Sequence, residues 1–245
     1  MRTLSFINLK GGTGKTTLST NTAIAFAQNG AKVLFIDNDK QGNTSAFFNA
    51  NPDIGLDDLY LTDATAKDVI QKTIYPNLDI ISGSMNLKAV EIKLLQKDNA
   101  ISASILEDKL RPVFSKYDLC VIDNPPDVGV TVINALLFTT DVIVVTTPDE
   151  DSISGVDEIY TQLNSINAKG FNIKCIFNQY LATDLSWDYK EYLKKKYSVF
   201  ETTIRFNRKF LQIAKKEKKP VFEVSARCGF SQDFFKFMNE LTKLA

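Results

Sequence analysis

The chain has 245 residues, with 29 basic and 29 acidic side chains and an ordinary share of apolar ones. This balance is typical of a globular protein with one sizeable core. It contains no histidine, which excludes Ser-His-Asp and Cys-His catalysis and every histidine-ligated metal site. Cys120, Cys175 and Cys228 have no CxxC spacing, and the first two lie in apolar runs, so we expect buried thiols.

Apolar runs alternate with helix-like segments along the chain. The runs predicted as strands are 4–7, 33–36, 78–81, 119–122, 142–145 and 173–177, and the predicted helices are 15–28, 85–96, 101–110, 154–166 and 185–196. This alternation predicts an α/β fold with a doubly wound, mostly parallel sheet and helices on both faces, in one domain covering residues 1–245. The segment 198–227 has no regular pattern, and we assign no element to it. No apolar stretch approaches the ~20 residues of a membrane span, and no secretory signal precedes the first run, so we expect a cytoplasmic protein.

A glycine-rich loop joins the first predicted strand to the first predicted helix. Its sequence is LKGGTGKTT at residues 9–17, which departs from the strict G-x-x-x-x-G-K-[ST] pattern only at Leu9. Glycines let consecutive backbone N–H groups turn toward an anion, and the helix that follows adds its positive N-terminal dipole. Lys15 can reach the terminal phosphates of a nucleotide, and the Thr16 hydroxyl can ligate Mg²⁺. The loop therefore predicts a phosphate-binding site.

The run KGGTGKTT resembles the deviant Walker A motif of the ParA/Soj and MinD ATPases. The resemblance continues in FIDNDKQGN at 35–43, in YDLCVIDNPP at 117–126 and loosely in VFET at 199–202, and it extends to about residue 240. It implies a P-loop ATPase that binds ATP and Mg²⁺ and forms a homodimer with ATP. In this family the nucleotide would be held by Gly11, Gly12, Thr13, Gly14, Lys15, Thr16 and Thr17.

The resemblance also assigns catalytic roles. Lys10 would reach across the dimer interface to the partner's nucleotide and stabilise charge in phosphoryl transfer. Asp39, the second acid of a D-x-D motif, would position the attacking water. Asp37 would support Mg²⁺, together with Thr16 and with Asp123, which ends a predicted strand. A turn or cap role is the alternative for each aspartate.

Two further features of the motif region concern positions 40 and 178. The family's proline after the second acid of D-x-D is Lys40 here, which frees the backbone φ angle and predicts a more mobile loop. Asn178 follows a predicted strand, where related proteins use an asparagine to contact adenine. An asparagine that only caps or turns the chain is an equal alternative.

Basic residues are concentrated in one segment of an otherwise acidic chain. Residues 190–219 hold eleven Lys or Arg against three Glu, a net charge of +8, which leaves −8 on the remainder. Such a patch attracts a polyanion, and the corresponding region of ParA-type proteins binds DNA without sequence specificity. We predict DNA contacts from Arg205, Arg208, Lys209, Lys215 and Lys216; a solvated lysine face is the alternative.

The last stretch, 230–244, has apolar residues at partly helical spacing. MinD-like proteins end in an amphipathic membrane helix, but this stretch mixes acidic with basic residues, so we expect it to pack onto the sheet. We therefore predict a ParA-like DNA-segregation ATPase, nucleoid-associated, with a centromere-binding, ParB-like partner and no stable membrane association. A MinD-like positioning ATPase and a metabolic P-loop enzyme of related fold are the two rival hypotheses.

Overall fold

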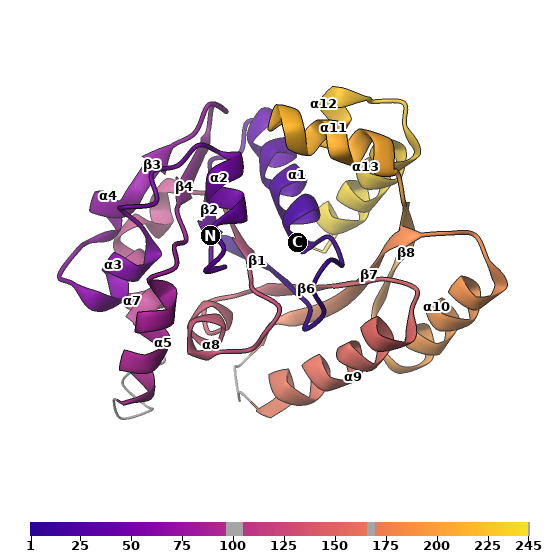
Figure 1. Ribbon diagram of the computed structural model, residues 1–245, viewed down its shortest axis with the longest axis horizontal. Helices are drawn as coiled ribbons and strands as arrows, with labels where there is room; N and C mark the ends of the chain where they lie inside the picture. The colour runs from indigo at the N-terminus through magenta and orange to yellow at the C-terminus, as the bar shows by residue number, and fades with distance from the viewer. Residues whose placement is uncertain (97–104, 166–169, 245) are drawn as a thin grey trace.

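The computed structural model describes residues 1–96, 105–165 and 170–244. Figure 1 shows the elements in these ranges. The strands are β1 (Arg2–Ile7), β2 (Val33–Asp37), β3 (Ile70–Lys72), β4 (Leu78–Ile81), β5 (Leu119–Asp123), β6 (Asp141–Thr146), β7 (Asn172–Tyr180) and β8 (Val199–Arg205). The helices are α1 (Lys15–Gln28), α2 (Asn43–Phe47), α3 (Leu56–Leu61), α4 (Ala66–Val69), α5 (Leu87–Leu95), α7 (Ile105–Leu110), the 3₁₀ helix η1 (Arg111–Lys116), α8 (Val130–Leu136), α9 (Glu150–Ser165), α10 (Asp184–Lys196), α11 (Arg208–Glu217), α12 (Val221–Val224) and α13 (Gly229–Thr242).

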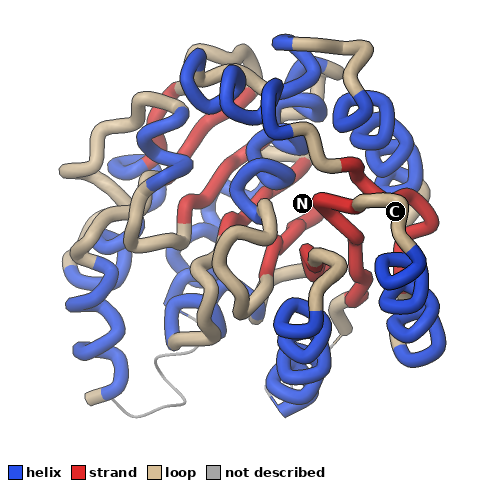
Figure 2. The backbone as a smooth tube through the Cα atoms, turned by 45° about the vertical axis from the view of Figure 1, so that its right-hand side comes forward, coloured by secondary structure: helices blue, strands red, loops and turns tan. Residues whose placement is uncertain are grey.

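Within the described ranges the strands form one sheet in the order β3-β4-β2-β5-β1-β6-β7-β8. All neighbouring pairs are parallel except β3 with β4, and Figure 2 shows the strands side by side with helices around them. The order places β1 near the middle, so the loop that follows β1 lies between the chain's two halves. The predicted doubly wound, mostly parallel sheet is confirmed.

Helices cover both faces of the sheet because its central strands are apolar on both faces. Phe35 of β2 packs with α1, α11, α12 and α13 on one face, whereas its neighbours Leu34 and Ile36 pack with α3, α5, α7 and α8 on the other. Ile7 and Val144 join α8 and α9 on that second face, nearer β7. In Figure 1 the α1 and α11–α13 group and the α8–α10 group lie on opposite sides of the sheet.

The main differences from the sequence prediction lie in short or edge elements. The unassigned segment 198–227 contains β8, α11 and α12, and the short elements β3 and α2–α4 were not predicted. β3 has three residues, two of them polar, and the missed helices α2, α3 and α4 have four to six residues, too few for a periodic pattern to stand out. Helix α9 starts at Glu150 rather than at 154 because polar residues form its first turn. Residues 101–104 of one predicted helix and residue 166 of another lie outside the described ranges.

The C-terminal helix α13 packs on the sheet as predicted. It buries Phe230, Phe234 and Phe237, and the Phe237 ring meets Phe200 of β8 edge-on with centroids 4.9 Å apart. Its apolar side chains therefore belong to the same hydrophobic core as those of α1. Cys120, Cys175 and Cys228 are buried and unpaired, also as expected. Among the described residues, no helix combines the length and the apolar character that crossing a membrane would need.

Phe234→Ala should reduce the free energy of unfolding by about 3–5 kcal/mol, because it leaves a cavity at a fully buried site. Its neighbour Phe235 is 43% exposed and provides the matched control: Phe235→Ala should cost less than half as much. Urea unfolding measures both values. Equal losses in the two variants would show that α13 does not pack through the Phe234 face.

Candidate nucleotide-binding site

The glycine loop lies between the end of β1 and the start of α1, as its sequence predicts. Gly12 and Gly14 adopt φ angles of +79° and +94°, in the left-handed region that only glycine adopts without strain. Gly14 is also the N-cap of α1, and a Cβ there would lie 2.1 Å from Nδ2 of Asn178. Conformation and space therefore both favour glycine at position 14.

Lys15 is buried at the first turn of α1, where its ammonium group has only weak partners. Its Nζ donates to the carbonyl oxygens of Asn8 and Lys10, at 3.1 and 3.2 Å. Among the described residues it forms no ion pair. Burial lowers the Lys15 pKa, and the more distant carboxylates of Asp123 and Asp39 oppose that shift. A buried cation of this kind is stabilised when an anion such as a phosphate enters beside it.

Asp123 ends β5 and holds two hydroxyl groups on one carboxylate oxygen. Its Oδ2 accepts from the Thr16 hydroxyl at 2.7 Å and from the Thr44 hydroxyl at 2.8 Å. Its Oδ1 is buried and has no hydrogen-bond partner among the described residues. Burial raises the Asp123 pKa to about 6, against the two hydroxyl bonds that lower it. An unpaired carboxylate oxygen next to a threonine hydroxyl is a donor set that fits Mg²⁺.

Asp37 lies directly opposite Asp123 in the parallel register of β2 and β5. Its Oδ2 accepts from the backbone N–H and the hydroxyl of Ser45, at 2.7 and 2.6 Å, and its Oδ1 accepts from the Asp39 N–H at 3.2 Å. Burial raises its pKa to about 7, and the facing Asp123 charge raises it further. Asp37 therefore orders the loop that carries Asp39 and the first turns of α2. Its support of Mg²⁺ stays a prediction.

Asp39 lies in a tight turn after β2, half-exposed on the same edge of the sheet. Its Oδ1 accepts from the Gln41 N–H and its carbonyl oxygen from the Gly42 N–H, both at 2.9 Å. Within the described ranges its second carboxylate oxygen accepts no hydrogen bond, so a ligand or a water molecule could reach it. Asp39 also faces Lys15 closely enough to raise the Lys15 pKa. The three predicted acids are therefore gathered around the phosphate loop.

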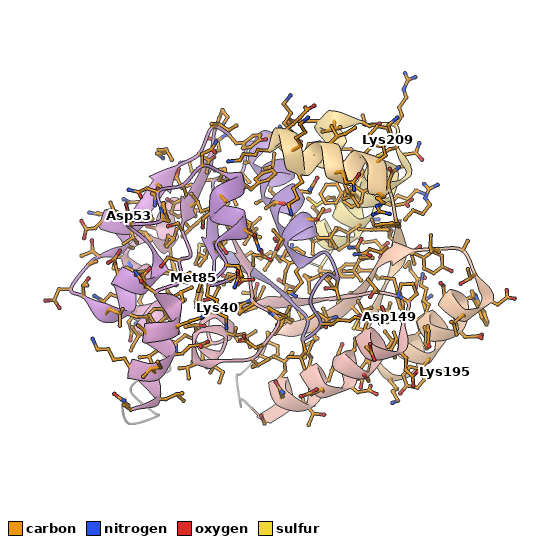
Figure 3. The ribbon with its side chains drawn as sticks, in the orientation of Figure 1. Lys40, Asp53, Met85, Asp149, Lys195 and Lys209 are labelled. Carbon is orange, nitrogen blue, oxygen red and sulfur yellow. The ribbon has the colours of Figure 1, made fainter. Side chains whose placement is uncertain are left out.

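Lys10 has an intramolecular partner that sequence reasoning missed. Its Nζ forms an ion pair and hydrogen bond with Asp149, and Asp151 lies 3.7 Å away. The Asp149 hydrogen bond is the main cause of a raised Lys10 pKa. Figure 3 shows Asp149 beside the start of α9, on the same side of the sheet as that helix. The only signal in the sequence is that Asp149 follows β6 at the edge where the other acids lie.

The end of β7 supports the glycine loop from the other side. Asn178 donates from Nδ2 to the Thr13 carbonyl at 2.7 Å, and Gln179 donates from Nε2 to the Gly12 carbonyl at 2.6 Å. Gln179 has a φ angle of +53°, which turns the chain at this point. Both amides therefore fix the loop's backbone. The adenine contact of Asn178 stays a prediction, and the role of Gln179 had no motif to reveal it.

The predicted DNA-binding residues fall into two groups. Arg205 of β8 pairs with Asp233 of α13, with Nε 2.6 Å and a terminal nitrogen 3.0 Å from the carboxylate. The other four are exposed on α11 and make no ion pair among the described residues: Arg208, Lys209, Lys215 and Lys216. Figure 3 shows that Lys209 on α11 and Lys195 on α10 lie far apart. The basic segment is therefore two surfaces, not one patch.

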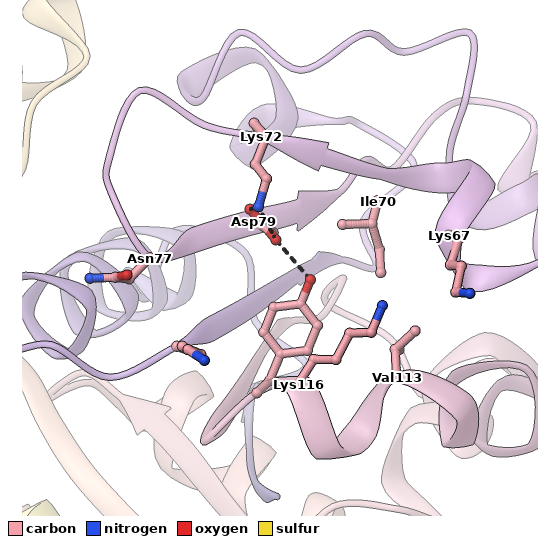
Figure 4. Close-up of a pocket in the computed structure, with 9 residues that line it drawn as sticks. Lys67, Ile70, Lys72, Asn77, Asp79, Val113 and Lys116 are labelled. Atoms are coloured by element: carbon pink, nitrogen blue, oxygen red, sulfur yellow. Dashed lines mark hydrogen bonds and ion pairs between the residues drawn. The ribbon is translucent and has the colours of Figure 1, made fainter.

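A second lysine cluster surrounds a pocket of about 400 Å³ away from the glycine loop. The Tyr117 hydroxyl donates to Asp79 at 2.8 Å, and Asp79 also pairs with Lys72 at 2.9 Å; Figure 4 shows Lys72 and Asp79 together at this pocket. Tyr117 precedes β5, whereas Asp123 ends it, so this pocket lies at the opposite edge of the sheet from the glycine loop. Its other lysines are Lys32, Lys67 and Lys116.

Gly14→Ala should reduce the free energy of unfolding by about 1–3 kcal/mol, because alanine is strained at this φ angle and its Cβ collides with Asn178. Gly11 offers a matched control in the same loop, since its φ angle is not positive and a Cβ there meets nothing within 4 Å. Gly11→Ala should change stability by less than about 0.5 kcal/mol. Denaturant unfolding of the ligand-free protein measures both changes. An unchanged free energy of unfolding in Gly14→Ala would contradict the packing of Asn178 on the loop.

Comparison with known proteins places this geometry in a family. Residues 1–176 match the AAA domain family. A virulence plasmid ParA family protein of Chlamydia psittaci is 36% identical over 162 residues, which cover 65% of this chain and 62% of that protein. The cell division protein PomZ of Myxococcus xanthus is 33% identical over 89% of this chain and 70% of its own length.

A solved structure agrees over the whole chain. The putative plasmid partition protein of Borrelia burgdorferi, bound to AMPPNP, superposes with a TM-score of 0.86 at 21% identity and covers 100% of this chain and 99% of that one. At this level of identity the superposition shows a shared fold. Together with the two sequence relatives, the signature lysine and the acids around the glycine loop, it leads to one conclusion: the chain belongs to the ParA/MinD family of deviant Walker A P-loop proteins.

Proposed function

We propose that this protein is a DNA-segregation ATPase: it binds Mg²⁺ and ATP, dimerises, binds DNA without sequence specificity, and releases the DNA on hydrolysis. The observation that carries the proposal concerns two charged side chains beside the glycine loop, one basic and one acidic. Among the described residues, Lys15 is a buried cation with no ion-pair partner, and Asp123 keeps a buried oxygen without a donor. Mg²⁺ with a nucleotide phosphate satisfies both at once. The plasmid ParA and plasmid partition proteins among its relatives support the biological setting.

The residues of the loop would share the work of binding. The backbone N–H groups of the glycine loop and Lys15 would hold the phosphates, while Thr16 and Asp123 would hold Mg²⁺, directly or through water. Mg²⁺ supplies charge neutralisation on the phosphates when it is bound. Asp39, with one carboxylate oxygen free of the turn, would orient the attacking water. Asn178, whose side chain already donates to the Thr13 carbonyl, would contact the adenine base, as the family resemblance implies.

Dimerisation would redirect Lys10. In the single chain its ammonium group is satisfied by Asp149 and Asp151. A partner's nucleotide phosphates would compete with these two carboxylates for it across the interface. The intramolecular pair would thus keep Lys10 ordered until an ATP-bound partner arrives. A cation supplied in trans ties hydrolysis to dimer formation.

The exposed cations of α11 would form the DNA surface. Within the described ranges Arg208, Lys209, Lys215 and Lys216 form no ion pair, whereas on α10 Lys194 pairs with Glu201 and Lys196 with Asp157, and Lys195 is exposed without one. Helix α11 therefore carries the larger group of cations that could displace counterions from DNA. Two copies in a dimer would double the surface, which links DNA affinity to nucleotide state. A ParB-like adaptor that stimulates hydrolysis, and a nucleoid location, belong to the same proposal.

The rival membrane-positioning role has less support. The helix that would serve as a membrane anchor is α13, and its apolar face is already buried against β8 and α12. Helix α10 does expose Leu185 and Trp187 and ends in lysines, but it also carries exposed Asp184 and Asp188, which an anionic lipid surface would repel. We therefore favour DNA over a lipid surface as the polyanion.

The proposal is tested by DNA affinity measured with no nucleotide, with ADP, with ATP and with a slowly hydrolysed ATP analogue. Binding should be tight only with ATP or its analogue. If each protomer neutralises ~3 phosphates, the ATP-bound dimer neutralises ~6. The logarithm of the DNA affinity should then fall with the logarithm of the salt concentration at a slope of about −5. Replacing Arg208, Lys209, Lys215 and Lys216 by Gln should weaken binding to all sequences alike, because phosphate contacts carry no base information.

The lysine pocket of Figure 4 provides the control for that experiment. Replacing Lys32, Lys67 and Lys116 by Gln removes three exposed lysines at the opposite edge of the sheet and should leave DNA affinity unchanged. Arg205 is kept, since its loss would break the pair with Asp233. The assignment of α11 fails if the α11 variant retains full affinity, and the switch fails if affinity is the same in all four nucleotide conditions.

A further inference from the structure

Lys40 stands where the ParA-type motif has proline, and it makes a contact that proline cannot make. Its Nζ lies 3.4 Å from Oδ2 of Asp127, with 29% of the lysine side chain and 42% of the aspartate side chain exposed. Asp127 follows the two prolines after Asp123. The ion pair therefore joins the turn that carries Asp39 to the loop that follows β5.

The same two loops are joined by a buried pair beneath the ion pair. Asn38 donates from Nδ2 to Oδ1 of Asn124 at 2.9 Å, and its backbone N–H donates to the Asp123 carbonyl at 2.9 Å. Both asparagines are almost completely buried. The inner end of each loop is thus fixed by the sheet edge. The outer end, where Lys40 and Asp127 lie, depends on the exposed ion pair.

The backbone at Lys40 does not explain why a lysine is present. In the described part of the chain the Lys40 N–H makes no hydrogen bond, so a proline at this position would sacrifice none. Proline would restrict the turn through its fixed φ angle, and lysine gives up that restriction. The Asp127 contact is the one available replacement for it on this side chain.

Asp127 is well placed to transmit the effect of the pair. Its Oδ1 accepts from the Gly129 N–H at 3.3 Å, next to the start of α8, while Oδ2 faces Lys40. The pair therefore connects the start of α8 to the Asp39 turn.

We propose that Lys40 and Asp127 form an ion-pair latch that positions the Asp39 turn, in place of the proline found at this point in the family. The proposal rests on the proposed ATPase function, because it assigns Lys40 a positioning role for the residue that orients water. Lys40 acts through Asp127 and does not itself bind the nucleotide. The latch should therefore affect turnover and leave nucleotide affinity unchanged.

The test compares Lys40→Met, Asp127→Asn and Lys40→Pro, with Asp127→Asn also made in the Lys40→Pro background. Asp127→Asn keeps the oxygen that accepts from Gly129 and removes only the charge. Lys72→Met is the matched control, since it breaks the Lys72–Asp79 pair at the opposite edge of the sheet. Three quantities are measured: kcat and KM for ATP, ADP affinity, and amide hydrogen exchange of residues 38–42 in nucleotide-free protein.

Lys40→Met and Asp127→Asn should each lower kcat and speed exchange of residues 38–42 by about three- to fivefold, the range set by a partly exposed ion pair. KM and ADP affinity should not change, and Lys72→Met should match the parent. Lys40→Pro should retain the parent's kcat. In that background Asp127→Asn should have no further effect, because the latch is already absent.

Two results would overturn the latch: exchange of residues 38–42 that is the same in all variants, or a cost of Asp127→Asn that is equal in the Lys40 and Lys40→Pro backgrounds. The exchange measurement needs no nucleotide, so it decides the latch even for a protein that does not hydrolyse ATP. Absence of ATP turnover in the parent, with normal latch behaviour in exchange, would instead contradict the proposed function.

Discussion

The site depends on the burial of the Lys15 ammonium group, whose hydrogen bonds within the described ranges go to the carbonyl oxygens of Asn8 and Lys10. Burying a cation without an anion is costly, and burial lowers the Lys15 pKa accordingly. The glycine loop that surrounds it needs two left-handed glycines, one of them in contact with Asn178. These features predict that a bound phosphate would stabilise the loop. Stability and function are therefore coupled at one residue.

The arrangement of acids around Lys15 follows from the sheet. In a doubly wound fold, ligands bind where the strands end, and the parallel register of β2 and β5 sets Asp37 opposite Asp123. This part of the site could be predicted from the sequence, because each acid directly follows an apolar run and the glycine loop has a known strand–helix context. The resemblance to ParA-type proteins added the roles of Lys10 and Asp39, which residue pattern alone does not supply.

The contacts that the sequence did not reveal are all side-chain contacts between residues far apart in the sequence. Lys10 with Asp149, Arg205 with Asp233, and Gln179 with the Gly12 carbonyl join segments from 28 to 167 residues apart. No local pattern fixes which of several nearby carboxylates a lysine selects. The elements β8 and α11 were missed because edge strands and mostly polar helices leave a weak apolar signal. That omission concealed the division of the basic segment between α10, where Lys194 and Lys196 are paired, and the exposed cations of α11.

The central claim is that Lys15 is a cation held ready for nucleotide phosphates. Titration of ATP and Mg²⁺ into the parent and into Lys15→Ala, followed by calorimetry, tests it most directly. The account predicts saturable binding to the parent and no measurable tight binding to the variant, while the variant's free energy of unfolding is equal to or greater than the parent's, since a buried unpaired charge has been removed. Equal ATP affinity in the two proteins would contradict the assignment of the loop.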